Sequence, residues 1–412
     1  MMEYGLIGER LGHSYSPQIH RCFGAYDYRL YPMSKAELEA VLRRREFKGL
    51  NITIPYKRDV LPFCDEISPT VRAVGSANTL VLQNGRLIAE NTDLPGFLAM
   101  LEKGGIALAG KKAVILGSGG TSLTAQAACR ALRARETVVV SRQGPVTYDA
   151  LYERHTDAQV IINATPVGMY PRNLEAPVDI AAFPRLSGVA DVIYNPARTA
   201  LLMDAQERGI PCADGLWMLV AQAWHAARLF LREDIPPGKM EEAYRSVRRS
   251  CLNLVLTGMP GSGKSTLGRL AAQALGRRFV DLDAEVEKQA GPIPEIFAGQ
   301  GEAAFRSLES QAAARFGKES GLVIAAGGGA ILRRENVRAL SQNGVLAWIR
   351  RPVEQLSTAG RPLSTGLEAL RRMEQARTPL YGAAADFCVE NEGTMERALR
   401  RLMEGFDEAA GH

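Results

Sequence analysis

The sequence lacks the features that mark membrane, secreted and nucleic-acid-binding proteins. No apolar run reaches membrane-spanning length, and the N-terminal residues MMEYGLIGER lack the apolar core of a signal peptide. The six cysteines are scattered without a C-x-x-C pair, which predicts reduced thiols in a cytoplasmic protein. No long basic block is present and the formal net charge of +5 is mild, so small anionic substrates explain the arginines as well as nucleic acid would. An ordinary globular composition remains, 46% hydrophobic and 23% charged, with a length that makes roughly two to three domains.

The strongest single motif is GMPGSGKST at residues 258–266, which matches the pattern G-x-x-x-x-G-K-[ST]. An apolar run over 252–256 precedes it and helical periodicity over 267–275 follows it, the strand-to-helix context in which this pattern binds phosphate. Glycines let the backbone wrap an anion, Lys264 adds positive charge, and Ser265 supplies a hydroxyl for Mg²⁺. The alternative, a glycine-rich turn that only joins strand to helix, is disfavoured because all the fixed positions are present. We therefore expect nucleotide contacts at Gly261, Ser262, Gly263, Lys264, Ser265 and Thr266.

Four short polar motifs lie in the first hundred residues. Ser14 and Ser16 precede a proline that starts a helix, and the other three are Thr53-Ile-Pro-Tyr-Lys57, Gly75-Ser-Ala-Asn78 and Glu90-Asn-Thr-Asp93. Taken singly, each is explained by a helix cap, a surface lysine or a turn residue. Together they resemble, in order, the signatures S-x-S-P, N-[IV]-T-[IV]-P-x-K, G-x-x-N-T and G-x-N-T-D of the substrate domain of shikimate dehydrogenase. The last motif departs at its first position, which is glutamate here.

That resemblance implies roles for the polar residues. Lys57 and Asp93 would form the catalytic pair, because a ketone that accepts a hydride develops oxyanion character, which a nearby ammonium stabilises and protonates. The carboxylate would orient the lysine. The substrate carboxylate and hydroxyls would be held by Ser14, Ser16 and Thr53, with Asn78 assisting.

A second glycine-rich stretch indicates a dinucleotide site. Residues 112–125 read as a strand, a glycine turn and a helix, and resemble the dinucleotide fingerprint with Ser122 where the third glycine would stand. Alone, this motif is no stronger evidence than a structural turn. The next predicted strand, 136–140, ends in Ser141-Arg142, and arginine there suits the 2′-phosphate of NADP, where an acidic residue would bind NAD. The expected cofactor contacts are Gly117, Ser118, Gly119, Gly120, Thr121, Ser141, Arg142 and Gly215.

Three further motifs extend the dehydrogenase resemblance over residues 4–245. Residues 160–169 resemble the family's next strand and its nicotinamide-side loop. Residues 191–199 follow the pattern D-x-x-Y-x-P-x-x-T, which adds Tyr194 as a substrate contact. A long helix starting at Gly215 would return to the first domain and carry Gln222, which the resemblance makes a substrate contact although helix glutamines usually face solvent. After it, residues 235–249 read as a solvated linker.

The remaining C-terminal residues carry a second set of motifs. Phe279–Asp283 reads as a strand ending with carboxylates at spacing two, which would point to opposite faces. Asp281 would then order Mg²⁺ water and Asp283 would accept from a substrate hydroxyl. Isolated arginines downstream would ordinarily be surface ion-pair partners. The whole set resembles shikimate kinase over 252–405, a small relative of the nucleoside monophosphate kinases.

The kinase resemblance implies the rest of a phosphoryl-transfer site. Shikimate would be gripped by Asp283, Arg306 and Arg377, with Gly327, Gly328 and Gly329 letting the backbone approach its ring. Arg361, on a lid, would close over the transferred phosphate beside Lys264. The family commonly carries another arginine shortly before the lid's R-P-L, stacked on adenine, and residues 353–360 contain none.

We therefore predict an α/β chain of two enzymes. Residues 1–98, completed by 214–246, would form the dehydrogenase substrate domain, 99–213 a Rossmann-like NADP domain, and 250–412 a P-loop kinase domain. The predicted reactions are NADPH-dependent reduction of 3-dehydroshikimate to shikimate and Mg-ATP-dependent phosphorylation of shikimate, in a cytoplasmic monomer or homodimer without nucleic-acid or membrane partners. Two alternatives stay open: a first half that oxidises quinate with NAD, and a second half that binds shikimate or nucleotide without turnover.

Overall fold

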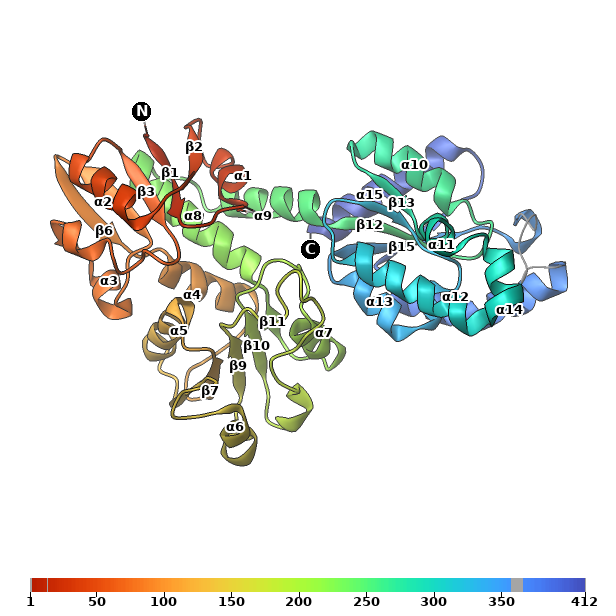
Figure 1. The fold of residues 1–412 in the computed structure, drawn as a ribbon, viewed down its shortest axis with the longest axis horizontal. Coiled ribbons are helices and arrows are strands. Elements are labelled where there is room, and N and C mark those ends of the chain that lie inside the picture. Colours follow the sequence, from red (N-terminus) through yellow and green to blue (C-terminus); the bar gives the residue numbers. More distant parts are fainter. Residues whose placement is uncertain (1, 13, 357–365, 412) are drawn as a thin grey trace. The chain divides into compact units, whose positions relative to one another are not determined.

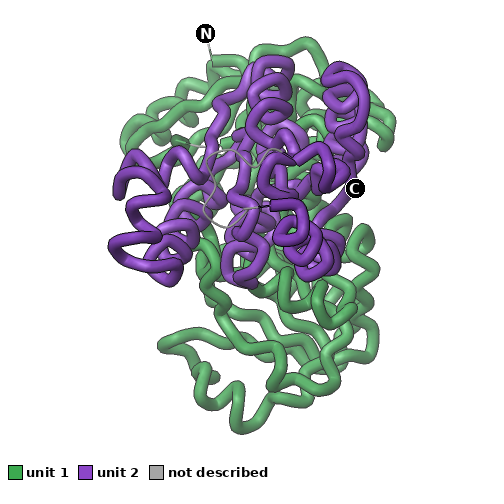
Figure 2. The backbone as a smooth tube through the Cα atoms, turned by 90° about the vertical axis from the view of Figure 1, so that its right-hand side faces the viewer, with its two compact units in different colours: residues 1–194, 199–247 green, residues 195–198, 248–412 purple. Residues whose placement is uncertain are grey.

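The computed structural model describes residues 2–12, 14–356 and 366–411. The chain divides into two compact units, coloured separately in Figure 2. The first unit comprises residues 1–194 and 199–247, and the second comprises 195–198 and 248–412. Within the described residues, no helix is both long and apolar enough to cross a membrane.

The first sheet of the first unit is mixed, with strand order β2-β1-β3-β5-β6-β4. β1 pairs in parallel with β2 and β3, whereas β5 runs antiparallel to β3 and β6. A buried cluster that includes Ile7, Leu38 and Leu50 fills its core. The strands are β1 (Tyr4–Gly8), β2 (Tyr28–Pro32), β3 (Gly49–Ile52), β4 (Glu66–Ile67), β5 (Thr79–Gln83) and β6 (Arg86–Glu90), and the helices are α1 (Ser16–Arg21), α2 (Lys35–Arg44) and α3 (Pro69–Val74).

The second sheet of the first unit is parallel, with strand order β11-β10-β9-β7-β8. The chain enters at β7, adds β8 on one side, and then crosses to β9 on the other side. The carboxyl ends of β7 and β9 therefore flank a topological switch point, where open α/β sheets bind their ligands. The strands are β7 (Lys112–Leu116), β8 (Glu136–Val140), β9 (Val160–Asn163), β10 (Gly188–Asp191) and β11 (Cys212–Ala213), and the helices are α5 (Gly120–Ala131), α6 (Tyr148–Arg154) and α7 (Ala200–Glu207).

Helices α4 (Asp93–Lys103) and α8 (Gly215–Leu231) pack against each other beside the first sheet. Gly96 permits this close approach, because a Cβ there would lie 2.9 Å from the carbonyl oxygen of Met218. The far end of α8 packs on the first sheet, with Phe230 over Gly49. One end of α4 and one end of α8 therefore lie beside the polar residues that follow β3 and β6.

The stretch expected as a solvated linker is largely helical. Helix α9 runs unbroken over Gly238–Cys251 and buries Ala243, Tyr244 and Val247. These residues recur on one helical face, and that periodicity is the physical reason for the helix. The division between the two units falls after Val247, inside this stretch, so the stretch does join them as expected, but it does so as a helix.

The second unit contains a parallel five-stranded sheet with order β13-β14-β12-β15-β16. Along the central strand, side chains alternate between the faces: Leu254 clusters with residues of α10 and α15, and Val255 clusters with residues of α12 and α13. Figure 1 shows these two pairs of helices on opposite sides of the sheet. The strands are β12 (Asn253–Thr257), β13 (Phe279–Asp281), β14 (Val323–Ala325), β15 (Gly344–Arg350) and β16 (Phe387–Glu390), and the helices are α10 (Lys264–Leu275), α11 (Leu282–Ala290), α12 (Ile293–Gly317), α13 (Arg334–Ser341), α14 (Leu367–Ala384) and α15 (Met395–Gly411).

Candidate active sites

A lysine–aspartate ion pair marks the first site. The Lys57 Nζ lies 2.6 Å from the Asp93 Oδ2, across a sequence separation of 36 residues. Asp93 is the first residue of α4, where the helix dipole favours a carboxylate. Its second oxygen accepts a hydrogen bond of 2.9 Å from the amide of Asn78. The carboxylate is therefore fixed at both oxygens, while the lysine side chain keeps 22% of its surface exposed.

A cavity of about 240 Å³ surrounds this pair. All the residues that the sequence predicts to contact the dehydrogenase substrate line it, and they come from both sheets of the first unit and from α8: Ser14, Ser16, Thr53, Asn78, Tyr194 and Gln222. Gly120, Thr121 and Gly215, predicted as cofactor contacts, line the same cavity. The Ser14 Oγ also accepts the backbone N–H of Ser16 at 3.2 Å, so the local turn explains part of that motif. Hydroxyls, amides and one ammonium thus converge on a small polar pocket.

Sequence reasoning missed two residues that line this cavity, Asn51 and His20. Asn51 accepts from the Tyr28 hydroxyl at 2.7 Å and donates to the Thr79 Oγ1 at 3.0 Å. The His20 ring is buried, stacks on Tyr28 and hydrogen bonds to the hydroxyl of Tyr26. Burial lowers the pKa of His20 to about 3, so the ring is neutral at physiological pH and does not serve as the site's acid. Asn51 lies two positions before Thr53, and this spacing was the signal in the sequence that could have identified it.

A further cavity lies at the switch point of the second sheet, where the sequence predicts cofactor contacts. Gly117 follows β7 with φ of 104°, and a Cβ there would lie 2.9 Å from the Ala164 carbonyl oxygen after β9. The cavity at this edge is lined by Gly117, Ser118, Gly119, Ser141 and Arg142, together with Arg172, which the sequence analysis did not single out. A glycine cradle with an arginine at the end of the second strand fits a dinucleotide that carries a 2′-phosphate.

Gly215 has a packing reason to be glycine. A Cβ at this position would lie 2.0 Å from the carbonyl oxygen of Val192. The close approach of α8 to the loop after β10 therefore requires glycine whether or not a cofactor touches it. Its cofactor contact stays a prediction.

A buried carboxyl supports the loop that carries Tyr194. Asp191 accepts hydrogen bonds from Asn163 at 3.0 Å, from the Ile193 N–H at 3.1 Å and from the Thr199 hydroxyl at 2.7 Å. Burial raises the pKa of Asp191 to about 7, and the three hydrogen bonds oppose that shift. The D-x-x-Y-x-P-x-x-T pattern is thus a hydrogen-bonded loop whose aspartate and threonine hold its ends together.

The second site is the phosphate loop after β12. Gly258, Gly261 and Gly263 all have positive φ, of 140°, 82° and 95°, and α10 begins at Lys264. The Lys264 Nζ donates to the carbonyl oxygens of Gly258 at 2.9 Å and Met259 at 3.0 Å, so the ammonium lies across the loop. This is a cradle of backbone N–H groups closed by a cation, which fits a nucleotide triphosphate.

Ser265 and Asp281, which the sequence predicts as Mg²⁺ ligands, contact each other beside the phosphate loop. The Ser265 Oγ donates to the Asp281 Oδ2 at 2.6 Å, which places two hard donors together beside the loop. No group of three or more His, Cys, Asp or Glu residues arranged to hold a metal occurs among the described residues. The pair of oxygen donors from Ser265 and Asp281 fits Mg²⁺, which usually takes one or two protein oxygens and completes its shell with water and substrate phosphates.

The expected geometry of the two aspartates after β13 was wrong. The strand ends at Asp281, and α11 begins at Leu282, so Asp283 lies in the first helical turn. Both carboxylates line the cavity of about 500 Å³ that contains the phosphate loop. The alternation of a strand does not apply once the chain turns into a helix, because Asp281 itself caps that helix.

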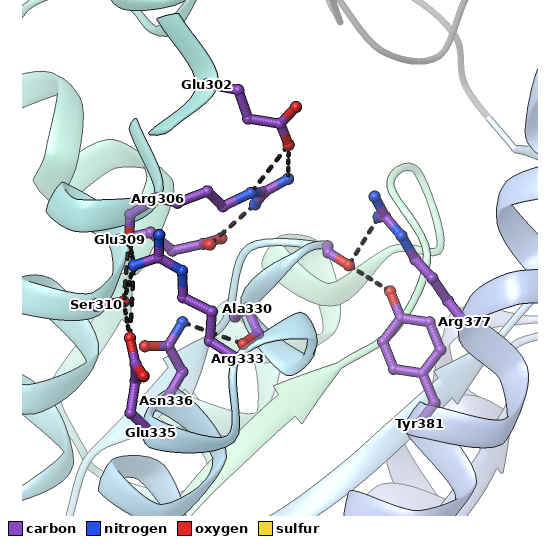
Figure 3. A network of polar contacts seen from close by, with 11 residues as sticks. Glu302, Arg306, Glu309, Ser310, Ala330, Arg333, Glu335, Asn336, Arg377 and Tyr381 are labelled. Atoms are coloured by element: carbon purple, nitrogen blue, oxygen red, sulfur yellow. Dashed lines mark hydrogen bonds and ion pairs between the residues drawn. The ribbon is translucent and has the colours of Figure 1, made fainter. Parts of the chain in front are cut away.

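The glycine loop at 327–329 is packed between charged side chains of this cavity. A Cβ at Gly327 would meet Asp283 at 2.7 Å, at Gly328 Pro260 at 2.9 Å, and at Gly329 the Arg306 guanidinium at 2.1 Å. Figure 3 shows Arg377 and Tyr381 reaching one carbonyl oxygen, that of Gly328, at 3.0 Å and 2.6 Å. The three consecutive glycines thus leave room for the predicted substrate residues to lie close to the loop backbone, and a side chain at Gly327 or Gly329 would have to displace one of them.

Glu309 was not anticipated from the sequence. It is buried beside Arg306 on α12 and accepts from it at 2.9 Å, while Glu302 accepts two further hydrogen bonds from the same guanidinium (Figure 3). Burial raises the pKa of Glu309, against the effect of Arg306. The available signal was the spacing of three between arginine and glutamate, which puts both on one helical face. Arg361 lies outside the described residues.

Comparison with known proteins assigns both units. Residues 6–80 match the family model described as shikimate dehydrogenase substrate binding domain. The NADP⁺-dependent shikimate dehydrogenase of Caldicellulosiruptor bescii is 37% identical over 261 residues, which cover 56% of this chain and 89% of that protein. The chain belongs to the shikimate dehydrogenase family. Residues 260–406 match the shikimate kinase model, so the chain joins a shikimate dehydrogenase to a shikimate kinase and is a bifunctional enzyme of the shikimate pathway.

Solved structures agree with the fold of the dehydrogenase half. Shikimate 5-dehydrogenase of Thermus thermophilus, in complex with NADP(H) and shikimate, has a TM-score of 0.54 at 31% identity, covering 60% of this chain and 99% of that chain. Quinate dehydrogenase of Corynebacterium glutamicum, in complex with NAD, has a TM-score of 0.54 at 29% identity with the same coverage. The predicted α/β architecture, a shikimate dehydrogenase followed by a P-loop kinase that use NADP and ATP, is confirmed. The predicted domain boundaries and residue roles stay predictions.

Proposed function

We propose that the Lys57–Asp93 site reduces the ketone of 3-dehydroshikimate and that the phosphate-loop site phosphorylates the 3-hydroxyl of the resulting shikimate. The observation that carries the first half is the ion pair of 2.6 Å inside a polar cavity of about 240 Å³. NADPH, when bound, supplies the hydride. Lys57 then stabilises the developing oxyanion and delivers the proton, while Asp93 and Asn78 hold the ammonium in place.

Substrate orientation in the dehydrogenase comes from the walls of the cavity. We assign the carboxylate of the substrate to the hydroxyls of Ser14 and Ser16, and its ring hydroxyls to Thr53 and Gln222. These groups are neutral, so they bind an anion by directed hydrogen bonds and leave Lys57 as the one cation that lines the described cavity.

In the kinase, we assign the carboxylate of shikimate to Arg306 and Arg377. Arg306 donates a hydrogen bond to Glu309, which is buried. It also donates to Glu302, whose side chain is 54% exposed. An incoming carboxylate takes the place of Glu302 at the guanidinium. Asp283 then accepts from the hydroxyl that is phosphorylated, and Lys264, Ser265 and Asp281 hold the phosphates and Mg²⁺.

Two alternative functions are disfavoured by specific residues. Arg142, at the end of β8, suits a 2′-phosphate and argues against a quinate dehydrogenase that uses NAD. The Ser265–Asp281 contact of 2.6 Å places two oxygen donors where Mg²⁺ would assist phosphoryl transfer, which favours turnover over a module that only binds. We further propose a cytoplasmic location, since the described cysteines are all free, and keep a monomer or homodimer as the expected oligomeric state.

A single assay tests the proposal. Full-length protein is given 3-dehydroshikimate, NADPH, ATP and Mg²⁺, and NADPH absorbance and shikimate 3-phosphate are followed together. The expected result is consumption of NADPH followed by the phosphorylated product. Shikimate that accumulates while ATP stays untouched would make the second half a binding module, and faster turnover of quinate with NAD⁺ than of shikimate with NADP⁺ would overturn the substrate assignment.

A further inference from the structure

The carboxyl end of β15 lies directly beside the phosphate loop. A Cβ at Gly258 would lie 2.4 Å from the carbonyl oxygen of Ile349. Asn391 ties the two elements together, because its backbone N–H donates to the Arg350 carbonyl at 2.8 Å and its side-chain amide donates to the Ser262 carbonyl at 2.7 Å. Arg351 follows Arg350 in the chain, so its backbone lies close to any ligand that binds at the phosphate loop.

Arg351 lines two cavities of the second unit. One is the phosphate-loop cavity of about 500 Å³, where it lies with Lys264 and Ser265. The other is a neighbouring cavity of about 140 Å³, lined also by Met259, Trp348, Ile349, Arg350, Pro352, Glu374, Thr378, Glu390 and Glu392. A ligand with phosphates in the first cavity and a ring in the second must pass the Arg351 side chain.

Arg351 differs from the other cations that line the phosphate-loop cavity. Lys264, Arg306 and Arg377 each donate hydrogen bonds to protein oxygens. The Nε of Arg351 is buried without a hydrogen-bond partner among the described residues, and no described carboxylate forms an ion pair with it. Its neighbour Arg350, in contrast, is paired with Glu390 at 2.6 Å. Among the described residues, Arg351 thus presents a planar cation whose Nε has no hydrogen-bond partner.

The character of the second cavity selects a purine base over a phosphate. Its carboxylates Glu374 and Glu392 repel phosphates and accept hydrogen bonds from an exocyclic amine such as that of adenine. A guanidinium stacks favourably on a flat aromatic ring. We infer that Arg351 stacks on the adenine of ATP from the end of β15 and so positions the nucleotide.

This inference rests on the proposed kinase function, and its test separates the two. Full-length Arg351→Ala and Arg351→Lys are compared with native protein by calorimetric titration with Mg-ADP and with tripolyphosphate, which lacks the base. The matched control is Arg371→Ala, an exposed arginine of α14 paired with Glu354 at 3.1 Å that lines neither cavity. Unchanged thermal unfolding and unchanged affinity for shikimate show that a variant keeps its fold.

The expected result is an ADP affinity about tenfold weaker for Arg351→Ala, the size of a desolvated cation–π contact, with tripolyphosphate within about twofold. Lysine, which lacks the planar fork, restores only part of the loss. ADP should also quench the fluorescence of Trp348, and Trp348→Phe should remove that signal. Equal ADP affinity for Arg351→Ala and native protein, or an equal loss of ADP and tripolyphosphate binding, would overturn the inference alone. Native protein that binds neither probe would overturn the kinase function with it.

Discussion

At the scale of single residues, the proposed dehydrogenase site contains one restrained charge, that of Lys57. Asp93 holds Lys57 at 2.6 Å and is itself held by Asn78 at 2.9 Å, so the ammonium has a fixed position before substrate arrives. Such preorganisation is what makes electrostatic stabilisation of an oxyanion effective, because no reorganisation is needed during the reaction.

We predict that Lys57→Ala lowers kcat for 3-dehydroshikimate reduction by about 10²–10⁴-fold, the usual contribution of a positioned acid. Phosphorylation of added shikimate should be unchanged. The matched control is Lys35→Ala, an exposed lysine paired with Asp59 at 3.1 Å. Near-native reduction by the Lys57 variant would remove this residue from the mechanism.

A second residue-scale prediction concerns the coenzyme. Arg142 lines the cavity at the carboxyl edge of the second sheet, where a 2′-phosphate would bind. Arg142→Ala should raise KM for NADPH by about tenfold or more, and KM for NADH by less than about twofold, since a charge-assisted contact of this kind is worth about 1.5–3 kcal/mol. Steady-state kinetics with both coenzymes measure this. Arg154→Ala, at the exposed end of α6, serves as control, and equal effects on the two coenzymes would contradict the assignment.

At the scale of elements, both sites lie beyond the ends of strands that run parallel to one another. β8 was predicted at 136–140 as the structure has it, because a run of β-branched residues between polar ones is typical of a strand. The phosphate loop was equally predictable, since its spacing carries its own mechanism. Asp283 was misplaced because the sequence does not show where the strand turns into a helix. Glu309 and Arg351 were missed because a charged residue on a helix or after a strand resembles any surface charge until the cavity beside it is known.

The glycine loop supports an element-scale prediction. In Gly329→Ala the new Cβ would lie 2.1 Å from the Arg306 Nη1, so the guanidinium must move away from Glu309 and from the predicted carboxylate position. We expect KM for shikimate in the kinase reaction to rise about tenfold, the cost of losing one charge-assisted hydrogen bond, with little change in thermal stability.

The control for that variant is Gly299→Ala on α12, where a Cβ meets nothing within 4 Å. Kinetics with shikimate as the varied substrate distinguish the two. An unchanged KM in Gly329→Ala would show that Arg306 does not bind the substrate carboxylate.

The loop after β10 supports a prediction about pH. The pKa of Asp191 is raised by burial from 3.8 to about 7 in the folded chain, so the folded state keeps a proton there that the unfolded state has released. The contribution of Asp191 to stability is therefore greatest below pH 4 and is lost as the pH rises to about 7, by at most about 1.4 kcal/mol per pH unit.

Asp191→Asn should remove this dependence. Thermal unfolding of the dehydrogenase unit between pH 5 and pH 8, a range that includes the pKa of about 7, should show a smaller loss of stability in the variant than in the native protein. Parallel pH profiles for the two proteins would contradict a protonated Asp191.

At the scale of the whole molecule, each site is complete within its own unit. The described residues that line the dehydrogenase cavity all belong to the first unit, and those that line the phosphate-loop cavity all belong to the second. No described side chain of one unit lines the cavity of the other unit. The two reactions should therefore be separable by mutation.

We predict that a mixture of Lys57→Ala and Lys264→Ala converts 3-dehydroshikimate to shikimate 3-phosphate, although neither variant does so alone. The Lys264 variant makes shikimate, which passes through solution to the intact kinase of the Lys57 variant. A lag before the product appears, measured by chromatography of quenched samples, should shorten as protein concentration rises. No product from the mixture would show that shikimate does not exchange through solution.

The ion pair of Lys57 and Asp93 has a consequence for the direction of metabolic flow. A donor that returns its proton to the same place serves oxidation and reduction equally, because the forward and reverse reactions share one transition state. Nothing in the first unit therefore favours shikimate over its ketone, and the ratio of the two follows the redox state of the nicotinamide pool. The second unit removes shikimate by spending a phosphoanhydride bond, a step that is hard to reverse. Because the units are joined on one chain, the kinase that removes shikimate is always present in the same amount as the reversible dehydrogenase that produces it.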